Sequence, residues 1–503
     1  DHVRKHTVSA GLDEAVLSEI PSYVPGDKPT VPGHEVTCRI VAVGDEVQHH
    51  RLGERVIVQA DYREIKTPGS NAAFGYNFEG ALQEYVLMDE RVIVDSRGER
   101  MLLPVDESLS ASAVALVEPW ACVEDSYVTR ERQAALNGGR LLVVADAGRE
   151  LVGLKGCYAL DQAPGQVTVL LADPGQRAAV HAWEARVSEA PSLTDLPAEG
   201  FDDIIYFGHD ANVIEALNDA LAAHGIMNLV LGGYSIGRLV SIGVGRVHYG
   251  GTRWIGTETG DASESYQWIP ETGEIRQGDR VEIIGAGGPM GQMHVLRALS
   301  LGHQGLEVVA ADVDDGRLAA LGRKALPLAK VNGVKYHAAN TNKETLAGPF
   351  DYIAVMAPVG AIVAEAVKDA DSRGIINIFA GIPATVRHEI DLDLYVEKHC
   401  FMFGTSGSTI EDMKIVLAKV REGQLLTNMS VDAISGMAGA LEGLAAVENR
   451  VLAGKIIVYP HLHDLGLIPL NKLGEAFPTV AAKLDHGNWC AEAESELLRV
   501  AGE

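Results

Sequence analysis

The feature that most constrains the fold of this chain is an internal repeat. The segment HGIMNLVLGG at residues 224–233 resembles RGIINIFAGI at 373–382, and FDDIIYF at 201 resembles FDYIAVM at 350, both pairs being 149 residues apart. WIGTETGD at 254 resembles MFGTSGST at 402, at an offset of 148. Similarity at a fixed offset indicates a duplicated structural unit. The alternative is that two doubly wound units share only their strand and turn composition.

Each repeat alternates apolar runs with helical patterns. From about residue 138 the chain reads GRLLVVA, GQVTVLLADPGQR, FDDIIYFG and NVIEALNDALAAHGIMNLVLGG, and a similar order follows from residue 278. Strands that alternate with helices in this way predict a parallel sheet covered by helices on both faces. We therefore expect two such sheets in tandem, joined by a polar, turn-rich connection at 260–277.

The second repeat carries a glycine-rich turn between a strand and a helix. In VEIIGAGGPMG, the residues expected around a bound pyrophosphate are Gly285, Gly287, Gly288, Pro289, Met290 and Gly291. Glycine is needed where the chain turns tightly and where backbone approaches a pyrophosphate held by helix N-terminal N–H groups. A turn that serves only strand-to-helix packing is the alternative.

Two residues after this turn bear on the choice of dinucleotide. The next strand, LEVVAADV, contains Asp312 near its end, and its carboxylate would accept hydrogen bonds from ribose hydroxyls and favour NAD over NADP. Arg317 could instead pair with a 2′-phosphate, so NADP stays an alternative cofactor.

The first repeat lacks the equivalent glycines. It reads VVADAGRELVG, with Ala145 and Ala147 at the places of Gly285 and Gly287. Arg149 and Glu150 stand where a phosphate would lie, and the acidic side chains there would repel a pyrophosphate. Although Asp173 resembles a ribose-binding acid, such residues also occur at strand ends as turn residues. We predict a degenerate copy that binds no dinucleotide.

The first segment is of a different type. Residues 34–94 alternate short β-branched runs with Gly and Asp turns, which predicts a compact all-β unit with the spacing of a small barrel. His34 and Glu35 lie in a turn before one of these runs. Imidazole and carboxylate are suitable zinc ligands, but a lone His-Glu pair is common, and a surface pair of polar residues explains it equally well.

The order of these motifs resembles that of a known family. GHE at 33–35 is followed by IVAVGDEV, GERV, GALQEYVL and ALVEPWACVEDSY, and then by the glycine turn. This order resembles the medium-chain dehydrogenase/reductase superfamily, in its zinc-dependent alcohol and polyol branch of sorbitol or threonine dehydrogenase-like enzymes. The resemblance covers about residues 1–130 and 278–460.

The resemblance implies an α/β fold with a GroES-like β-barrel catalytic domain and two tandem Rossmann-type, doubly wound parallel-sheet domains. An N-terminally incomplete GroES-like catalytic domain is expected at residues 1–135, followed by a degenerate Rossmann-like insert at 136–262 and an NAD-binding Rossmann domain at 263–410. The chain then returns to the catalytic domain at 411–460 and ends in a helical C-terminal extension at 461–503.

By the same resemblance, a catalytic zinc ion would be held by His34, Glu35 and Glu118, with Glu118 bound directly or through water. The strand ends at Ala357, Pro358 and Gly381 would lie near the nicotinamide. The family's further ligand is a cysteine upstream, and Asp1-His2 resembles the end of its turn, which implies a truncated N-terminus. The stretch where a structural zinc lobe would lie contains no cysteine, so we expect at most one zinc ion per chain.

The resemblance implies a zinc-dependent oxidoreductase that transfers a hydride between the alcohol carbon of a polyol, sugar or other secondary alcohol and NAD(P). One alternative is a zinc-free reductase of the same superfamily. The other is a catalytically inactive nucleotide-binding or assembly protein. The histidines of YPHLHD, His461 and His463, could form a separate metal site because residues i and i+2 of a strand share a face.

Charge and composition limit the other partners. The chain has 42 basic and 69 acidic residues and a net charge of −27, which argues against nucleic acid and against an anionic membrane surface. Its five cysteines are scattered without a CxxC pair, which suits a reducing compartment, and we expect a cytoplasmic protein. A homo-oligomer is expected, with a small-molecule alcohol, polyol or sugar as substrate.

Overall fold

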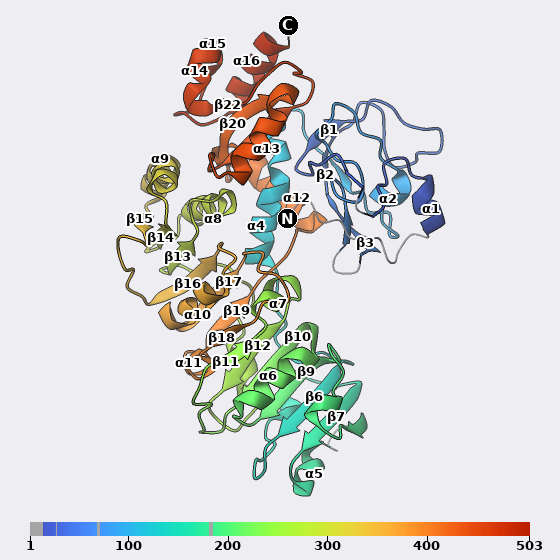
Figure 1. Ribbon diagram of the computed structural model, residues 1–503, viewed down its shortest axis with the longest axis vertical. Helices are drawn as coiled ribbons and strands as arrows, with labels where there is room; N and C mark the ends of the chain where they lie inside the picture. Colours follow the sequence, from blue (N-terminus) through green and yellow to red (C-terminus); the bar gives the residue numbers. More distant parts are fainter. Residues whose placement is uncertain (1–13, 27, 68–70, 181–184, 503) are drawn as a thin grey trace. The chain divides into compact units, whose positions relative to one another are not determined.

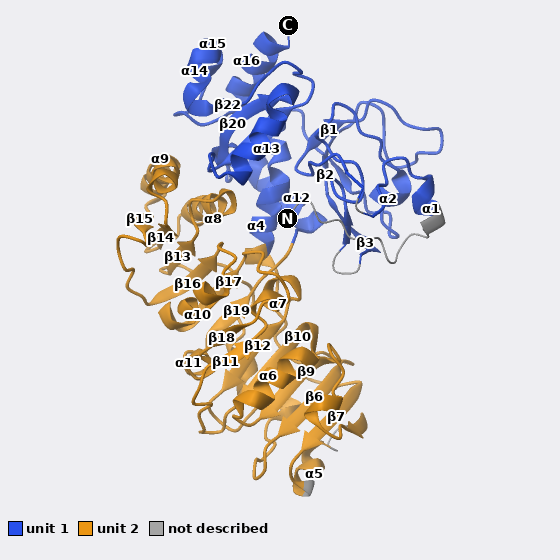
Figure 2. Ribbon diagram, viewed as in Figure 1, with its two compact units in different colours: residues 1–125, 407–503 blue, residues 126–406 orange. Residues whose placement is uncertain are grey.

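The computed structural model describes residues 14–26, 28–67, 71–180 and 185–502. The chain divides into two compact units (Figure 2), which are residues 1–125 with 407–503, called unit 1, and residues 126–406, called unit 2. Among the described residues, none of the helices combines the length and the apolar character needed to cross a membrane. The domain boundaries expected from the sequence remain predictions.

In the part of unit 2 that the structure describes, two six-stranded parallel sheets are present, one from each repeat (Figure 1). The first sheet has the order β12-β10-β9-β6-β7-β8. Its strands are β6 (Arg140–Ala145), β7 (Gln166–Leu171), β8 (Arg186–Glu189), β9 (Phe201–Phe207), β10 (Leu221–Val230) and β12 (Arg253–Thr257). The central strands β6 and β9 are almost fully buried, as expected where a parallel sheet is covered on both faces.

The second sheet repeats this topology with the order β15-β14-β13-β16-β17-β19. Its strands are β13 (Arg280–Ile284), β14 (Glu307–Asp312), β15 (Lys335–Asn340), β16 (Phe350–Val355), β17 (Ala370–Ile378) and β19 (Phe401–Phe403). Its helices are α8 (Pro289–Ser300), α9 (Asp315–Asn332), α10 (Gly360–Asp369) and α11 (Leu392–Glu397). In both sheets the strand order reverses between the first and fourth strands, which is the Rossmann order, so the predicted fold class is confirmed.

The repeats differ directly after their first strands. In the second repeat the 12-residue helix α8 follows the glycine turn. In the first repeat the chain instead enters a short 3-10 helix, Leu154–Cys157, and no α-helix is described between β6 and β7. Gly148 and Gly153 interrupt this stretch with φ of 76° and 80°, a backbone conformation that does not continue a right-handed helix. The first repeat therefore lacks the helix N-terminus as well as the glycines.

The remaining helices of unit 2 belong mainly to the first repeat. They are α5 (Arg177–Val180), α6 (Ala211–Ala220) and α7 (Val244–Tyr249). Two further three-residue strands, β11 (Val240–Ile242) and β18 (His388–Ile390), pair with each other outside the main sheets. Polar connections precede β13, where a 3-10 helix spans Glu264–Trp268.

The described residues of unit 1 form three small sheets. The strands β1 (Thr37–Arg39), β2 (Arg55–Val58) and β5 (Leu102–Pro104) form one antiparallel sheet, and β3 (Asp61–Lys66) pairs with β4 (Asn71–Ala73). A third sheet consists of β20 (Val431–Gly436), β21 (Lys455–Tyr459) and β22 (Ile468–Pro469). The N-terminal sheets surround a core that includes Val56, Val58, Tyr62 and Phe74.

The N-terminal strands are fewer and shorter than the alternation in the sequence predicts. Residues 40–43 and 81–89 are not strands, and residues 90–93 form the short helix α2 (Glu90–Ile93), which Asp89 caps. Val41 and Tyr85 are 58% and 67% exposed, so the alternating apolar residues there have no buried face to cover. Alternation alone therefore overestimated the β content of this segment.

Helices complete unit 1. They are α1 (Glu14–Glu19), α3 (Ala111–Ala115), α4 (Val117–Val128, which ends in unit 2), α12 (Ile410–Arg421), α13 (Ala440–Glu448), α14 (Leu473–Ala476), α15 (Pro478–Ala481) and α16 (Ala491–Ala501). The C-terminal segment is anchored by buried Glu494, whose carboxylate accepts the N–H groups of Ala111 and Ser112 at 2.5 and 2.8 Å. The hydroxyl of Tyr459 donates to the same carboxylate at 2.9 Å.

Candidate metal and dinucleotide sites

The three predicted zinc ligands come together in unit 1. One donor atom from each of His34, Glu35 and Glu118 lies within 4.8 Å of the others. His34 and Glu35 stand in the loop before β1, and Glu118 belongs to the first turn of α4. Gly33, directly before His34, has φ of 101°, a conformation that favours glycine and that turns the loop here. Residues some 80 positions apart in the sequence thus meet at one point.

The charges at this cluster favour a cation. Glu118 is buried, and burial, followed by the nearby Glu35 carboxylate, raises the pKa of Glu118 well above its ordinary value. Lys455 from β21 donates to Glu35 Oε1 at 2.5 Å and partly offsets the negative charge. One imidazole and two carboxylates are a set of donors that zinc accepts, and catalytic zinc sites use three protein ligands. The residues present therefore fit a zinc ion.

Two neighbours of this cluster were not predicted from the sequence. Lys455 lies 420 residues beyond Glu35 and carries no local signal. The Cys122 thiol lies one helical turn beyond Glu118, with Sγ 3.8 Å from Glu118 Oε1, and the spacing of four residues on a helix could have indicated this contact. Burial raises the pKa of the Cys122 thiol. The expected upstream cysteine and Asp1-His2 lie outside the described residues.

The glycine turn of the second repeat is tightly packed. The N–H groups of Gly285 and Ala286 both donate to Ala311 O, at 2.8 and 3.0 Å, which ties the turn to β14. Gly288 is the N-cap of α8, and Pro289 occupies its first turn. The N–H groups of Met290 and Gly291 are among the first helical amides, which have no acceptor within a helix. This end of α8 can therefore hold an anion.

Asp312 and Arg317 both lie beside this turn. Asp312 Oδ2 accepts the N–H of Gly287 at 2.8 Å, and Oδ1 accepts the N–H groups of Val313 and Asp314. A Cβ atom on Gly287 would lie only 2.6 Å from Arg317 Cβ and 2.9 Å from Asp312 Oδ2. Glycine is thus required here, and the carboxylate is held rigidly next to the turn.

The predicted nicotinamide-end residues follow the strands β16 and β17. Ala357 is half-buried and Pro358 is exposed, both beyond the carboxyl end of β16. Gly381 follows β17, and a Cβ atom there would lie 2.8 Å from Tyr249 Oη. Tyr249 belongs to α7 of the first repeat, so the insert contributes a side chain next to this position. This contact was not predicted from the sequence.

Comparisons with known proteins find similarity to alcohol and polyol dehydrogenases. The family model described as the alcohol dehydrogenase GroES-like domain matches residues 6–97. The chain is 29% identical over 270 residues to L-sorbose 1-phosphate reductase of Klebsiella pneumoniae, which is 48% of this chain and 64% of that protein. It is 27% identical over 168 residues to (R,R)-butanediol dehydrogenase of Bacillus subtilis, which is 29% of this chain and 45% of that protein.

These similarities support a relationship to the medium-chain dehydrogenase/reductase superfamily. The chain is also 29% identical over 249 residues to the uncharacterized protein YggP of Escherichia coli, covering 45% of this chain and 58% of that protein. The chain thus spans less than two thirds of the length of these curated relatives. The crystal structure of 2R,3R-butanediol dehydrogenase from Bacillus subtilis aligns over 92% of this chain and 95% of its own, with 15% identity and a TM-score of 0.47.

In the first repeat, side chains and backbone of the same repeat hold the turn after β6. Arg149 reaches from the turn after β6 to β10, where it donates to Val230 O at 2.6 Å, and its guanidinium lies 5.0 Å from the centre of the Tyr234 ring. Gly148 donates its N–H to Asp173 Oδ2 at 2.6 Å. Gly148 therefore occupies the place of Gly287, and the assignment of Ala147 to that place was one residue off.

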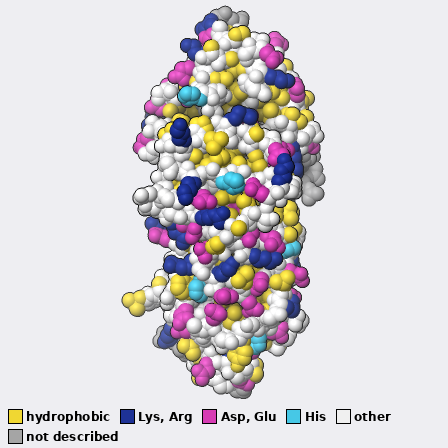
Figure 3. Space-filling view, turned by 90° about the vertical axis from the view of Figure 1, so that its left-hand side faces the viewer, with side chains coloured by type: hydrophobic (Ala, Val, Ile, Leu, Met, Phe, Trp, Pro, Cys, Tyr) yellow, Lys and Arg dark blue, Asp and Glu magenta, His cyan; other side chains and the backbone are white. Residues whose placement is uncertain are grey.

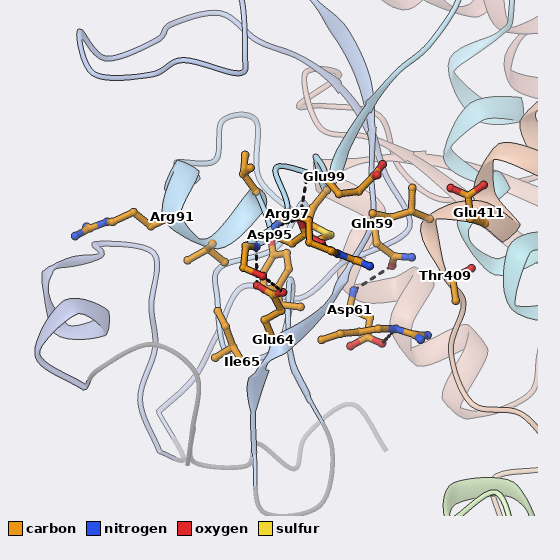
Figure 4. A pocket seen from close by; sticks show the side chains of 17 residues that line it. Gln59, Asp61, Glu64, Ile65, Arg91, Asp95, Arg97, Glu99, Thr409 and Glu411 are labelled. Atoms are coloured by element: carbon orange, nitrogen blue, oxygen red, sulfur yellow. Dashed lines mark hydrogen bonds and ion pairs between the residues drawn. The ribbon is translucent and has the colours of Figure 1, made fainter. Parts of the chain in front are cut away.

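Unit 1 also has a pocket of about 800 Å³ (Figure 4). Charged side chains from β3, from residues 91–99 and from the start of α12 surround it, and His34, Glu35 and Glu118 are not among its lining residues. Arg63 is paired with Asp61 at 3.0 Å and Arg97 with Asp95 at 2.9 Å, so these two basic groups already have acidic partners. On the molecular face shown in Figure 3, basic side chains are scattered among acidic ones.

Proposed function

We propose that this chain is a zinc- and NAD(P)-dependent oxidoreductase that transfers a hydride between the alcohol carbon of a polyol, sugar or other secondary alcohol and the nicotinamide. The observation that carries this proposal is the convergence of His34, Glu35 and Glu118, whose donor atoms lie within 4.8 Å of one another. A glycine turn with a helix N-terminus, in the same chain, supplies the place for a dinucleotide.

Each residue of the cluster has a role in this proposal. His34 and Glu118 would hold a zinc ion, with Glu35 as a third ligand or as its neighbour. Zinc at this position supplies a Lewis acid that polarises the substrate hydroxyl. Lys455, which pairs with Glu35, keeps that carboxylate from carrying an unbalanced charge in the half-buried site. A carboxylate tied to a lysine is a weaker metal ligand than a free one, so His34 and Glu118 are expected to dominate binding.

The second repeat would bind the cofactor. The first amides of α8 would donate to the pyrophosphate, and Asp312, fixed by the N–H of Gly287, would accept hydrogen bonds from the ribose. Arg317 stands beside the same carboxylate and would pair with a 2′-phosphate, so NAD and NADP both stay within the proposal.

The substrate class follows from the names of the relatives. Among the chain's relatives, one is named a mannitol-1-phosphate 5-dehydrogenase, one an L-sorbose 1-phosphate reductase and one a butanediol dehydrogenase. All three names describe hydroxyl or carbonyl chemistry on short polyhydroxylated or diol substrates. We therefore place polyols and sugar alcohols, with and without a phosphate, first among the substrates to be tried.

The experiment combines metal analysis with turnover by the full-length protein. Zinc content is measured, and reduction of NAD and NADP is followed with diols, polyols, sugars and sugar phosphates. The proposal expects about one zinc ion per chain and alcohol-dependent reduction of the nicotinamide. His34→Ala and Glu118→Ala should lose both zinc and turnover, whereas the control His461→Ala, at an exposed histidine, should retain both.

Three results would contradict the proposal. Turnover without bound metal would indicate a zinc-free reductase of the superfamily. Bound nucleotide without metal or turnover would indicate an inactive nucleotide-binding or assembly protein. Loss of zinc in His461→Ala, with zinc retained in His34→Ala, would move the metal site to the other histidines.

A further inference from the structure

The two repeats of unit 2 meet through elements that are equivalent in sequence. The strands β11 and β18 begin at residues 240 and 388, and the helices α7 and α11 begin at 244 and 392, so both pairs are 148 residues apart. β11 and β18 pair antiparallel, with Ser241 opposite Glu389 at the centre. Positions 241 and 389 are themselves 148 apart, so Ser241 faces its own counterpart. This register is the one that a two-fold axis produces.

Contacts around the short strands obey the same rule. A Cβ atom on Gly256 would lie 2.5 Å from Val396 Cγ2, and one on Gly404 would lie 2.9 Å from His248 Cα. Gly256 and Gly404 are 148 residues apart, and so are His248 and Val396. When residue i contacts residue j, the counterpart of i contacts the counterpart of j. Such reciprocity defines an isologous interface.

The starts of the two helices show the reciprocity again. Gly245 of α7 donates its N–H to Val386 O at 3.2 Å, in the loop before β18. Its counterpart Asp393 of α11 accepts the N–H groups of Ile236 and Gly237, both at 2.8 Å, in the loop before β11. Each helix therefore contacts the loop that precedes the short strand of the other repeat.

The interface between the repeats is built like a protein core. Side chains from both sides, each at most 2% exposed, belong to one continuous apolar cluster that includes Val240, Ile242, Val247, Trp254, Ile390, Leu392, Tyr395 and Met402. The Tyr395 hydroxyl also donates to Trp254 O at 2.8 Å. Apolar interfaces of this kind are typical of obligate, permanent association.

We propose that the first repeat occupies the place of a second subunit. The face formed by β18, α11 and β19 is of the self-complementary type that joins two copies of one domain, and the first repeat covers it within the same chain. The last strands of the two sheets, β12 and β19, contact each other. Each strand therefore covers a sheet edge that, if exposed, could pair with a strand of another chain. This face is therefore closed to a second copy, and any association between chains uses another surface.

Cysteines at the two-fold position test the proposal on the full chain. Directly opposite residues of an antiparallel pair have Cα atoms about 4.5–5.5 Å apart, which lies within the disulfide range of about 4.4–6.8 Å. The double variant Ser241→Cys/Glu389→Cys should therefore lose both new thiols on mild oxidation and keep the mass of a single chain. Glu389→Cys alone should keep its thiol, because its only opposite residue is then a serine. Wild-type protein, with its five native cysteines, is the control for background oxidation.

Other outcomes overturn the proposal. If a second copy used this face, the two-fold rule would place position 389 of one chain opposite position 389 of the other, and Glu389→Cys alone would oxidise to a covalent dimer. Covalent dimers of the double variant would show that the repeats pair between chains. A folded double variant, checked by circular dichroism, that keeps both thiols would show that the register is wrong. Non-reducing electrophoresis and peptide mass analysis distinguish these results.

Discussion

The packing of Gly291 makes the substitution Gly291→Ala a direct test of the glycine turn. A Cβ atom at this position would lie 2.2 Å from Gly285 O and 2.7 Å from Ala286 Cα. Both contacts are to backbone, so no side-chain rotation can relieve them. Either α8 or the turn must move, and the amides at the start of α8 move with it.

The size of the effect follows from two opposing contributions. Overpacking costs about 1–3 kcal/mol, and backbone contacts this short place the cost at the upper end. Alanine in a helix regains up to about 1 kcal/mol relative to glycine. The unfolding free energy of unit 2 should fall by about 2 kcal/mol as a result. Loss of one hydrogen bond to the charged pyrophosphate, worth about 1.5–3 kcal/mol, weakens NAD binding by about 10- to 150-fold.

Gly288→Ala is the matched control. The nearest atom to a Cβ on Gly288 is Gly285 O at 3.6 Å, and the N-cap φ of −76° suits any residue. Its melting temperature should fall less than that of Gly291→Ala, because alanine at an N-cap costs only about 1 kcal/mol. Thermal unfolding and NAD titration by fluorescence measure both effects. A Gly291→Ala protein with wild-type melting and NAD affinity would refute the packing argument, as would equal melting losses in the two variants.

Three further predictions address single residues. Burial, and then Asp369, raises the pKa of Glu282 to about 7. The Glu282 carboxyl therefore ionises at a lower pH in the unfolded chain than in the folded one, and the unfolding free energy should fall by up to about 3 kcal/mol as pH rises from about 4.5 to 7. Glu282→Gln should remove this pH dependence in urea titrations at several pH values, and an unchanged dependence would contradict the prediction. Because burial and Glu35 raise the pKa of Glu118, a zinc ion must displace a proton from this carboxyl group. Zinc affinity, measured in competition with a chelator, should therefore rise from pH 5 toward neutrality. Glu118→Gln should reduce this pH dependence. Equilibrium dialysis should give one bound NAD per chain. Arg149→Ala should still bind one NAD, because the first repeat lacks the helix after β6. A second bound NAD per chain would refute the prediction that the first repeat is degenerate.

The sequence predicted the sheets of unit 2 well and the strands of unit 1 less well. Parallel strands buried on both faces are continuous apolar runs, and segments such as VEII and FDYIAV stand out between polar turns. In residues 34–94 the apolar residues alternate, but several of them, such as Val41 and Tyr85, stay exposed. Their pattern has the two-residue period of a strand. That period predicts a strand only where one face is buried, and here it is not.

The candidate metal site could be anticipated only through the resemblance to a family. His34 and Glu35 are adjacent in sequence, but the approach of Glu118 and the pairing of Lys455 with Glu35 depend on how distant segments fold together. No periodicity encodes such contacts. The Cys122 thiol is different, because its distance of one helical turn from Glu118 follows from the helix alone.

The two repeats differ in the features of the dinucleotide site but share the features of the interface between them. In the first repeat, Arg149 bonds to Val230 O, and the chain after β6 enters a short 3-10 helix in place of the long helix of the second repeat, which supports the prediction that this copy binds no dinucleotide. β11 and β18 still pair in the register of a two-fold axis, and the glycines at 256 and 404 still admit the opposite helix. An interface that both repeats share constrains both equally, whereas a ligand site needed once can decay in one copy. We therefore expect the role of the first repeat to lie in covering the face formed by β18, α11 and β19.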